Sequence, residues 1–123
     1  MTFNINWDKN GVYIKFRGNV TAQDLIDANN YVISNANFET IEYQIFDFLH
    51  IGEFTITSYD ISILGVMDKA QTDFKPNMKV AILTQDDYVI EIISEYEQLM
   101  AGTKWETKMF PSIEETREWI KKK

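Results

Sequence analysis

Polar and apolar side chains alternate through the first part of the chain in the pattern of two short β-strands. The two segments are residues 3–7 and 12–16, and the second carries an apolar side chain at every other position. A strand with one buried and one solvent-facing side has this period of two. Asn10-Gly11 between the segments is a strong signal for a tight turn. We therefore predict an N-terminal antiparallel hairpin that ends at Gly18.

Beyond residue 20, apolar runs typical of buried strands alternate with segments of helical period. The predicted strands are residues 43–49, 78–83 and 104–110. Each of the predicted helices follows a residue suited to cap it, and these caps are Thr21, Thr57, Asp86 and Ser112. Residues 35–40 form a polar break. The residues expected to face inward are Leu25, Ala28 and Val32 in the first helix, Val89, Ile92, Ile93, Tyr96 and Met100 in the third, and Ile113, Thr116 and Ile120 in the last. The predicted order is β-β-α-β-α-β-α-β-α.

This order predicts an α/β fold. Strands that alternate with helices form βαβ units, and such units build a parallel sheet. We expect a mostly parallel sheet of about five strands, with the N-terminal hairpin as its antiparallel edge and the helices packed on the sheet. The chain shows no repeat or linker, so residues 1–123 are expected to form a single domain.

The predicted helix from Thr57 to residue 75 has more apolar surface than one packed face requires. Its stripe at spacings of three and four is Ile56, Tyr59, Ile63, Met67, Ala70 and Phe74, which Ile61, Leu64 and Val66 widen further. A helix that is apolar over so much of its circumference packs against something further. This further contact could be with a second copy of the chain in a homodimer, with a partner protein or with a small apolar ligand. We favour a protein interface. The candidate residues for this surface are Phe54, Tyr59, Ile61, Ile63, Leu64 and Met67.

Charge and composition exclude several classes of partner and site. The 123 residues carry a net charge of −7, and no Lys or Arg lies between Gly18 and Asp68. Nucleic-acid binding needs clustered positive charge, and residues 121–123 read as a solvated tail, so we expect no nucleic-acid partner. The chain has no cysteine and one histidine, His50, which argues against a zinc site. The five glycines are scattered, so we expect no nucleotide and no other cofactor.

No segment has the pattern of a targeting or membrane-spanning sequence. The first residues lack a basic stretch followed by an apolar one. The longest apolar runs are far shorter than the roughly 20 residues that cross a bilayer. We therefore expect a cytoplasmic protein without a membrane span.

Three hydroxyl side chains, Thr55, Thr57 and Ser58, stand where the second predicted helix begins. Unpaired backbone N–H groups at a helix start can hold an anion, and a phosphate on one of these hydroxyls would be favoured there. Capping of the helix by Thr57 is the favoured interpretation, because Asp60 follows at the spacing of a capping box. The alternatives left open are an anion site and a phosphorylation site.

Two acidic positions follow predicted strands. Asp47 ends the strand at 43–49, and with His50 it could form an acid–base couple. Asp86-Asp87 follows the next strand and is explained by capping of a helix. Because the chain has no glycine-flanked serine nucleophile, we expect no enzyme activity.

Several segments, in their order and spacing, resemble a known family. They are G11-VYIKFRG-18, Thr21 at a helix start, Y43-QIFDF-48, K79-VAIL-83 and M109-FPSIEETREWI-120. Together they resemble the SpoIIAA-like group of bacterial proteins, whose fold is related to the STAS (anti-sigma-factor antagonist) domain. In STAS regulators a partner kinase phosphorylates a serine at a helix start, and Thr57 and Ser58 stand at about that place. The Asp-Ser-Ser-Gly hallmark is replaced here by residues 55–60, TITSYD.

The resemblance implies a non-enzymatic regulatory module that works through protein contacts. Its working surface would be residues 49–57 and the helix that follows. The alternative is a carrier or sensor of a small apolar, lipid-like ligand, with a pocket lined by Phe46, Phe54, Tyr59, Ile63 and Met67. An enzyme that uses Asp47 and His50 ranks third.

Overall fold

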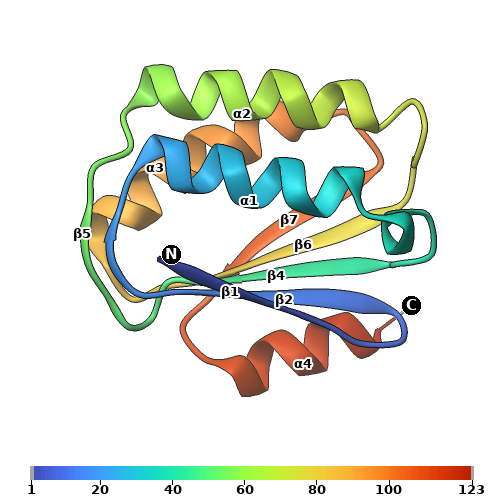
Figure 1. Ribbon diagram of the computed structural model, residues 1–123, viewed down its shortest axis with the longest axis horizontal. Helices are drawn as coiled ribbons and strands as arrows, with labels where there is room; N and C mark the ends of the chain where they lie inside the picture. Colours follow the sequence, from blue (N-terminus) through green and yellow to red (C-terminus); the bar gives the residue numbers. More distant parts are fainter. Residues whose placement is uncertain (1, 123) are drawn as a thin grey trace.

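The structure, a computed structural model, describes residues 2–122 (Figure 1). The strands are β1 (Phe3–Trp7), β2 (Gly11–Phe16), β3 (Gly18–Val20), β4 (Tyr43–Asp47), β5 (Ile51–Phe54), β6 (Met78–Leu83) and β7 (Trp105–Phe110). The helices are α1 (Ala22–Ser34), α2 (Ser58–Gln71), α3 (Asp87–Met100) and α4 (Ile113–Lys121), with a short 3-10 helix, η1, at Ala36–Glu39. None of the helices in this part of the chain is long and apolar enough to cross a membrane.

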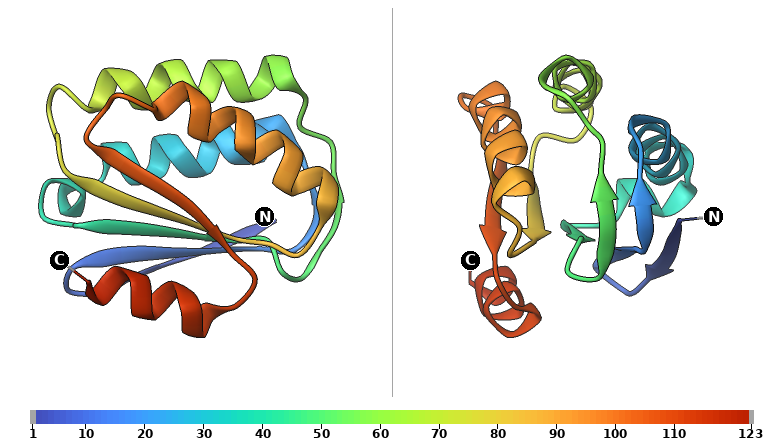
Figure 2. Two further views of the ribbon diagram at one scale, coloured as in Figure 1. Left: turned by 180° about the vertical axis from the view of Figure 1, so that it is seen from behind. Right: turned by 90° about the vertical axis from the view of Figure 1, so that its left-hand side faces the viewer.

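Within residues 2–122 the main sheet has five strands in the order β1-β2-β4-β6-β7. β1 pairs with β2 in antiparallel orientation, and the later pairs in this sheet are parallel. α1, α2 and α3 cover one face of the sheet, and α4 lies against the other (Figure 2). The predicted element order, the mixed sheet and the N-terminal hairpin are confirmed.

A second, two-stranded sheet lies outside the predicted elements. It pairs β3 with β5 in parallel, with Gly18 opposite Ile51 and Val20 opposite Phe54. Gly18 has a φ of 66°, a left-handed conformation that glycine adopts readily. The residue therefore redirects the chain into β3 instead of ending the strand region. Both strands are too short to show a clear alternation, which is why their sequences resemble loops.

The hairpin turn depends on Asp8 and not on the conformation expected for Asn-Gly. One carboxylate oxygen of Asp8 accepts hydrogen bonds from the backbone N–H groups of Asn10 (2.9 Å) and Gly11 (3.0 Å). No non-glycine residue among residues 2–122 has a positive φ, so Asn10 lacks the left-handed conformation of a type I′ turn. Gly11 serves another purpose, because a Cβ atom at this position would lie 2.2 Å from the Tyr43 ring.

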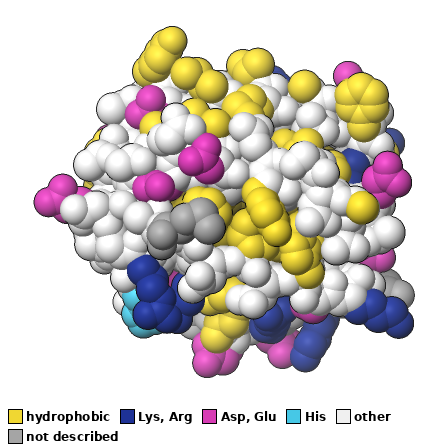
Figure 3. Space-filling model, in the orientation of Figure 1, with side chains coloured by type: hydrophobic (Ala, Val, Ile, Leu, Met, Phe, Trp, Pro, Cys, Tyr) yellow, Lys and Arg dark blue, Asp and Glu magenta, His cyan; other side chains and the backbone are white. Residues whose placement is uncertain are grey.

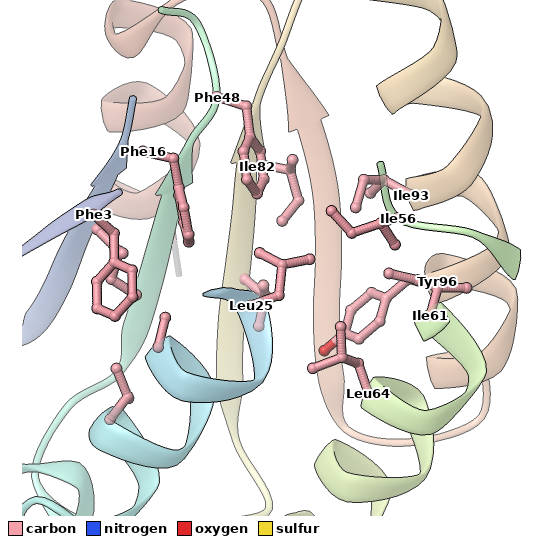
Figure 4. Packing of buried hydrophobic residues seen from close by; sticks show 14 of the residues in the cluster. Phe3, Phe16, Leu25, Phe48, Ile56, Ile61, Leu64, Ile82, Ile93 and Tyr96 are labelled. Atoms are coloured by element: carbon pink, nitrogen blue, oxygen red, sulfur yellow. The ribbon is translucent and has the colours of Figure 1, made fainter. Parts of the chain in front are cut away.

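The main core fills the space between the sheet and helices α1 to α3 (Figure 4). The Phe16 ring of β2 stacks on Phe48, with ring centroids 4.7 Å apart, and lies 5.7 Å from the Phe3 ring. α1 contributes Leu25, Ala28 and Val32, and α3 contributes Val89, Ile92, Ile93, Tyr96 and Met100. These are the inward-facing residues that the sequence predicts for the two helices.

Helix α2 buries a different face from the predicted one. Its buried residues are Ile61, Leu64, Gly65 and Asp68. Tyr59 and Phe74 of the predicted stripe are exposed, and the helix ends at Gln71. Apolar residues occur on several sides of α2, so their spacing could not identify the inward side. Gly65 identifies it, because α2 approaches α3 so closely there that a Cβ atom would lie 2.7 Å from Leu99 Cδ1.

A smaller core lies between the sheet and α4. It consists of Tyr43, Ile45, Ala81, Leu83 and Phe110, with Trp119 of α4 packed against it. The ring centroids of Phe110 and Trp119 are 5.4 Å apart. Thr116 of α4 is buried as predicted, so both faces of the central strands are covered.

We expect Gly11→Ala to destabilise the protein by about 1–3 kcal/mol, the usual range for overpacking a buried position. The added methyl group would overlap the Tyr43 ring, whose hydroxyl donates a hydrogen bond to Asp8. Urea denaturation followed by circular dichroism measures the loss. In a Tyr43→Val background the same substitution should cost less, because the ring is gone. An equal cost in both backgrounds would contradict this explanation.

Candidate functional site

The first turn of α2 lies at the carboxyl end of the parallel strands, the edge at which open α/β sheets place their ligands. Thr57 is the N-cap of this helix. Its hydroxyl accepts a hydrogen bond from the Asp60 backbone N–H (3.3 Å), and its own backbone N–H donates to Asp60 Oδ2 (3.0 Å). The predicted capping box is confirmed.

The other two hydroxyls of this segment have separate partners. Ser58 Oγ donates a hydrogen bond to Glu95 Oε2 at 2.9 Å, which joins the first turn of α2 to α3. Thr55 Oγ1 donates to the Val20 carbonyl at 3.3 Å, and the Thr55 backbone N–H donates to the same oxygen at 3.0 Å. The three hydroxyls therefore do not converge on one ligand. The carboxylate beside Ser58 opposes an anion there.

The predicted acid–base couple is not formed. Asp47 is buried and accepts hydrogen bonds from the Tyr13 hydroxyl and from the Leu49 backbone N–H (2.9 Å), whereas His50 is exposed. Burial and the bond to Asp47 raise the pKa of Tyr13 above its ordinary value. Among residues 2–122, no three His, Asp or Glu side chains are grouped to hold a metal ion. Asp47 thus fixes the end of β4 against β2.

The outer side of α2 carries a row of exposed apolar side chains. Tyr59 is 74% exposed, Ile63 36% and Val66 69%, and Met67 beside them is half-buried. We call Tyr59, Ile63 and Val66 the outer row of α2. Figure 3 shows hydrophobic side chains along the top of the molecule, where α2 lies.

Some residues of the predicted surface lie in the core instead. Ile61 and Leu64 are buried and face α3 and the sheet, so they cannot contact a partner (Figure 4). Phe54 is half-buried, with its ring centroid 5.5 Å from Phe48 and 6.2 Å from Tyr88.

A buried polar cluster beneath α2 lies outside the predicted site. Asp68 of α2 accepts a hydrogen bond from the Tyr96 hydroxyl of α3, and Asn29 of α1 lies on the same cavity of about 40 Å³. Burial raises the pKa of Asp68 to about 6. The sequence does hold a signal for this cluster, because Asp68 follows Ile61 and Leu64 at helical spacing, as a single acid among inward-facing residues.

The architecture matches solved structures of SpoIIAA-like fold. The chain is similar to the anti-sigma factor antagonist SpoIIAA in its unphosphorylated form, with a TM-score of 0.62 and 11% identity over 96% of each chain. It is also similar to an uncharacterized protein of the DUF3478 family from Shewanella loihica PV-4, with a TM-score of 0.56 and 15% identity over 95% of this chain and 90% of the other. No family model and no curated protein matches the sequence. The likeness establishes a SpoIIAA-like fold, as the resemblance implied.

A negative charge at position 58 should be unfavourable because of Glu95. We expect Ser58→Glu, a mimic of phosphoserine, to destabilise the protein by about 0.5 kcal/mol more in the wild type than in a Glu95→Gln background. Urea denaturation of the four proteins of this cycle, at pH 7.5 and low salt, measures the difference. High salt should reduce it. If the substitution has the same effect in both backgrounds, Glu95 does not oppose a charge at Ser58.

Proposed function

We propose that this protein is a regulatory module that acts by binding another protein, and that the outer row of α2 is the centre of its docking surface. The observation that carries the proposal is the exposure of Tyr59, Ile63 and Val66 on one side of a helix whose other side is packed. The SpoIIAA-like fold supports it, since one similar structure is that of an anti-sigma factor antagonist.

The spacing of the outer row suits recognition by a partner. Single exposed apolar residues are normal on a protein surface. Tyr59, Ile63 and Val66 instead follow the i, i+4, i+7 spacing of a helix that presents anchor residues to an apolar groove. Tyrosine is also among the residues that contribute most to binding energy at interfaces.

The charge around the outer row indicates the chemistry of the partner. Apart from the buried Asp68, two acidic residues lie in α1, one in α2 and four in α3, against one basic residue within these helices, Lys69. Complementary charge steers association and excludes wrong partners. We infer a partner surface with an apolar centre and Lys or Arg residues around it.

A symmetric homodimer through this face is disfavoured by the same charges. A two-fold interface places a surface against its own copy, and here that would bring the acids of α1 and α3 together. A different, basic protein is therefore the proposed occupant.

Ser58 is the proposed position for control of this surface. It adjoins Tyr59, and a phosphate on it would add negative charge at the edge of the outer row and displace its hydrogen bond to Glu95. Thr57 and Thr55 are less suited, because the first caps α2 and the second is bonded to Val20 within the β3–β5 sheet.

The alternative function, a carrier of an apolar ligand, gains no support. The cavity beneath α2 has about 40 Å³, whereas pockets for small-molecule ligands usually have about 300–1,000 Å³. Of the residues predicted to line a ligand pocket, Phe46 alone lines this cavity. Two larger hollows, of about 650 and 500 Å³, lie elsewhere and are lined by none of the residues predicted for a ligand pocket.

The docking surface can be tested with the double variant Tyr59→Ser/Val66→Ser. Partners are first captured from lysate of the source organism on immobilised wild-type protein, identified by mass spectrometry and purified. We expect a basic partner whose Kd rises at least tenfold with the double variant, because two apolar anchors are lost. Binding should also weaken as salt rises.

Tyr31→Ser provides the matched control. Tyr31 is an exposed tyrosine of α1, outside the outer row, and its replacement should leave the Kd unchanged. Circular dichroism verifies that both variants are folded. Wild-type affinity in the double variant would refute the docking surface, and a partner that is another copy of this chain would refute the charge argument.

A further inference from the structure

We propose that protonation of Asp68 controls how firmly α2 is held against α1 and α3. This control would regulate the docking surface, since α2 carries the outer row, and that regulatory role rests on the function proposed above. The pH-dependent attachment of α2 itself is independent of any partner.

The geometry places a carboxyl group where its charge is poorly compensated. Asp68 is 7% exposed, and of its two oxygens Oδ2 accepts a hydrogen bond from the Tyr96 hydroxyl. Oδ1 has no hydrogen-bond partner among residues 2–122, and neither does Nδ2 of Asn29, which is 4% exposed. Both side chains line the same small cavity. The Asn29 amide nevertheless favours the charged carboxylate, so that with the Tyr96 hydroxyl it offsets part of the effect of burial on the pKa of Asp68. A buried polar atom without a hydrogen-bond partner destabilises the closed state, and water would supply the missing partner when α2 opens.

Because of its position, α2 is the element whose attachment would be weakened by the burial of these unpartnered polar atoms. In the end-on view, α2 lies farther from the sheet than α1 and α3 (Figure 2). It packs mainly against α3. The cavity lies beneath it, between the three helices and β4 and β6.

Among the residues that the structure describes, no Lys or Arg side chain lines the cavity around Asp68. α1 contributes Leu25 and Asn29 to the cavity wall, and the sheet contributes apolar side chains such as Phe46 and Ile82. The titratable group that faces Asp68 within this wall is Tyr96. Burial raises the pKa of Tyr96 well above its ordinary value, so its hydroxyl remains a hydrogen-bond donor.

The sign of the pH effect follows from the pKa of Asp68. In the closed state this pKa is raised from 3.8 to about 6, and in an opened, solvated state it returns toward the ordinary value. The stabilisation of the closed state of α2 by protonated Asp68 is therefore fully present below about pH 4. It falls as pH rises toward 6, and it stays at its lower value above that. From these two pKa values, the opening equilibrium of α2 should increase about tenfold between pH 5 and pH 7.5.

Hydrogen exchange of the full chain without a partner tests this proposal. Exchange of the α2 amides is measured at pH 5 and pH 7.5, and opening equilibria are obtained after correction for the intrinsic exchange rates. We expect the tenfold increase in the wild type. Asp68→Asn should remove it, because an amide keeps the acceptor for Tyr96 without the charge. Asp73→Asn is the matched control, since Asp73 is an exposed acid just beyond α2, and it should keep the wild-type increase.

A persistent tenfold increase in Asp68→Asn, or no increase in the wild type, would overturn the proposal. If Asp68→Asn does not fold, a carbon-detected NMR titration of the wild-type Asp68 carboxyl replaces it. A midpoint near 6 supports the proposal, and a midpoint near 4 refutes it. Failure of the docking surface would appear in the partner measurements alone and would leave these exchange results unchanged.

Discussion

The contact between α2 and α3 determines how the rest of this molecule is arranged. α1 and α3 lie on the sheet through continuous apolar faces, whereas α2 is placed farther out and packs mainly against α3. Its approach requires Gly65, where any side chain would meet Leu99. A helix in this outer position exposes more than one of its sides. The exposed outer row and the cavity beneath α2 are thus two consequences of one packing arrangement.

The acidity of the helical face has two sources, and only one of them is explained by the fold. The N-termini of α1, α2 and α3 lie at the same edge of the sheet, and each is capped with the help of an acid, namely Asp24, Asp60 and Asp86. Helix N-termini favour negative charge, so these acids are structural. Asp27 and Glu91 lie further along their helices and form no cap. Asp27 accepts a hydrogen bond from Gln23 within α1, whereas capping does not explain Glu91, for which the proposed basic partner would offer a reason.

The sequence predicts those elements whose packing is simple. α3 has most of its apolar residues on one side, although Tyr88 and Ile90 are exposed, so its inward face could be identified as Val89, Ile92, Ile93, Tyr96 and Met100. α2 has apolar residues on several sides, and its orientation depends on a glycine contact with a residue about 30 positions away, which spacing does not reveal. β3 and β5 depend on pairing with each other, and neither has a local signal.

The candidate site divides in the same way. The capping box of Thr57 is local, since it involves residues three positions apart, and it could be predicted. The hydrogen bonds of Ser58 with Glu95 and of Asp47 with Tyr13 join residues more than 30 positions apart. Such contacts depend on the tertiary fold, so the sequence indicated the residue types without their partners.

Two contacts of α2 that each involve a carboxylate meet at one turn of α3, and this links the control proposed at Ser58 to the control proposed at Asp68. Ser58, in the first turn of α2, bonds to Glu95, and Asp68, near its last turn, bonds to Tyr96. Glu95 and Tyr96 are adjacent in α3. A negative charge added at Ser58 and a proton lost from Asp68 would both weaken the same interface, because each places uncompensated charge against it. Both proposed controls would therefore act through the side of α2 that faces α3, and each would change how α2 presents the outer row.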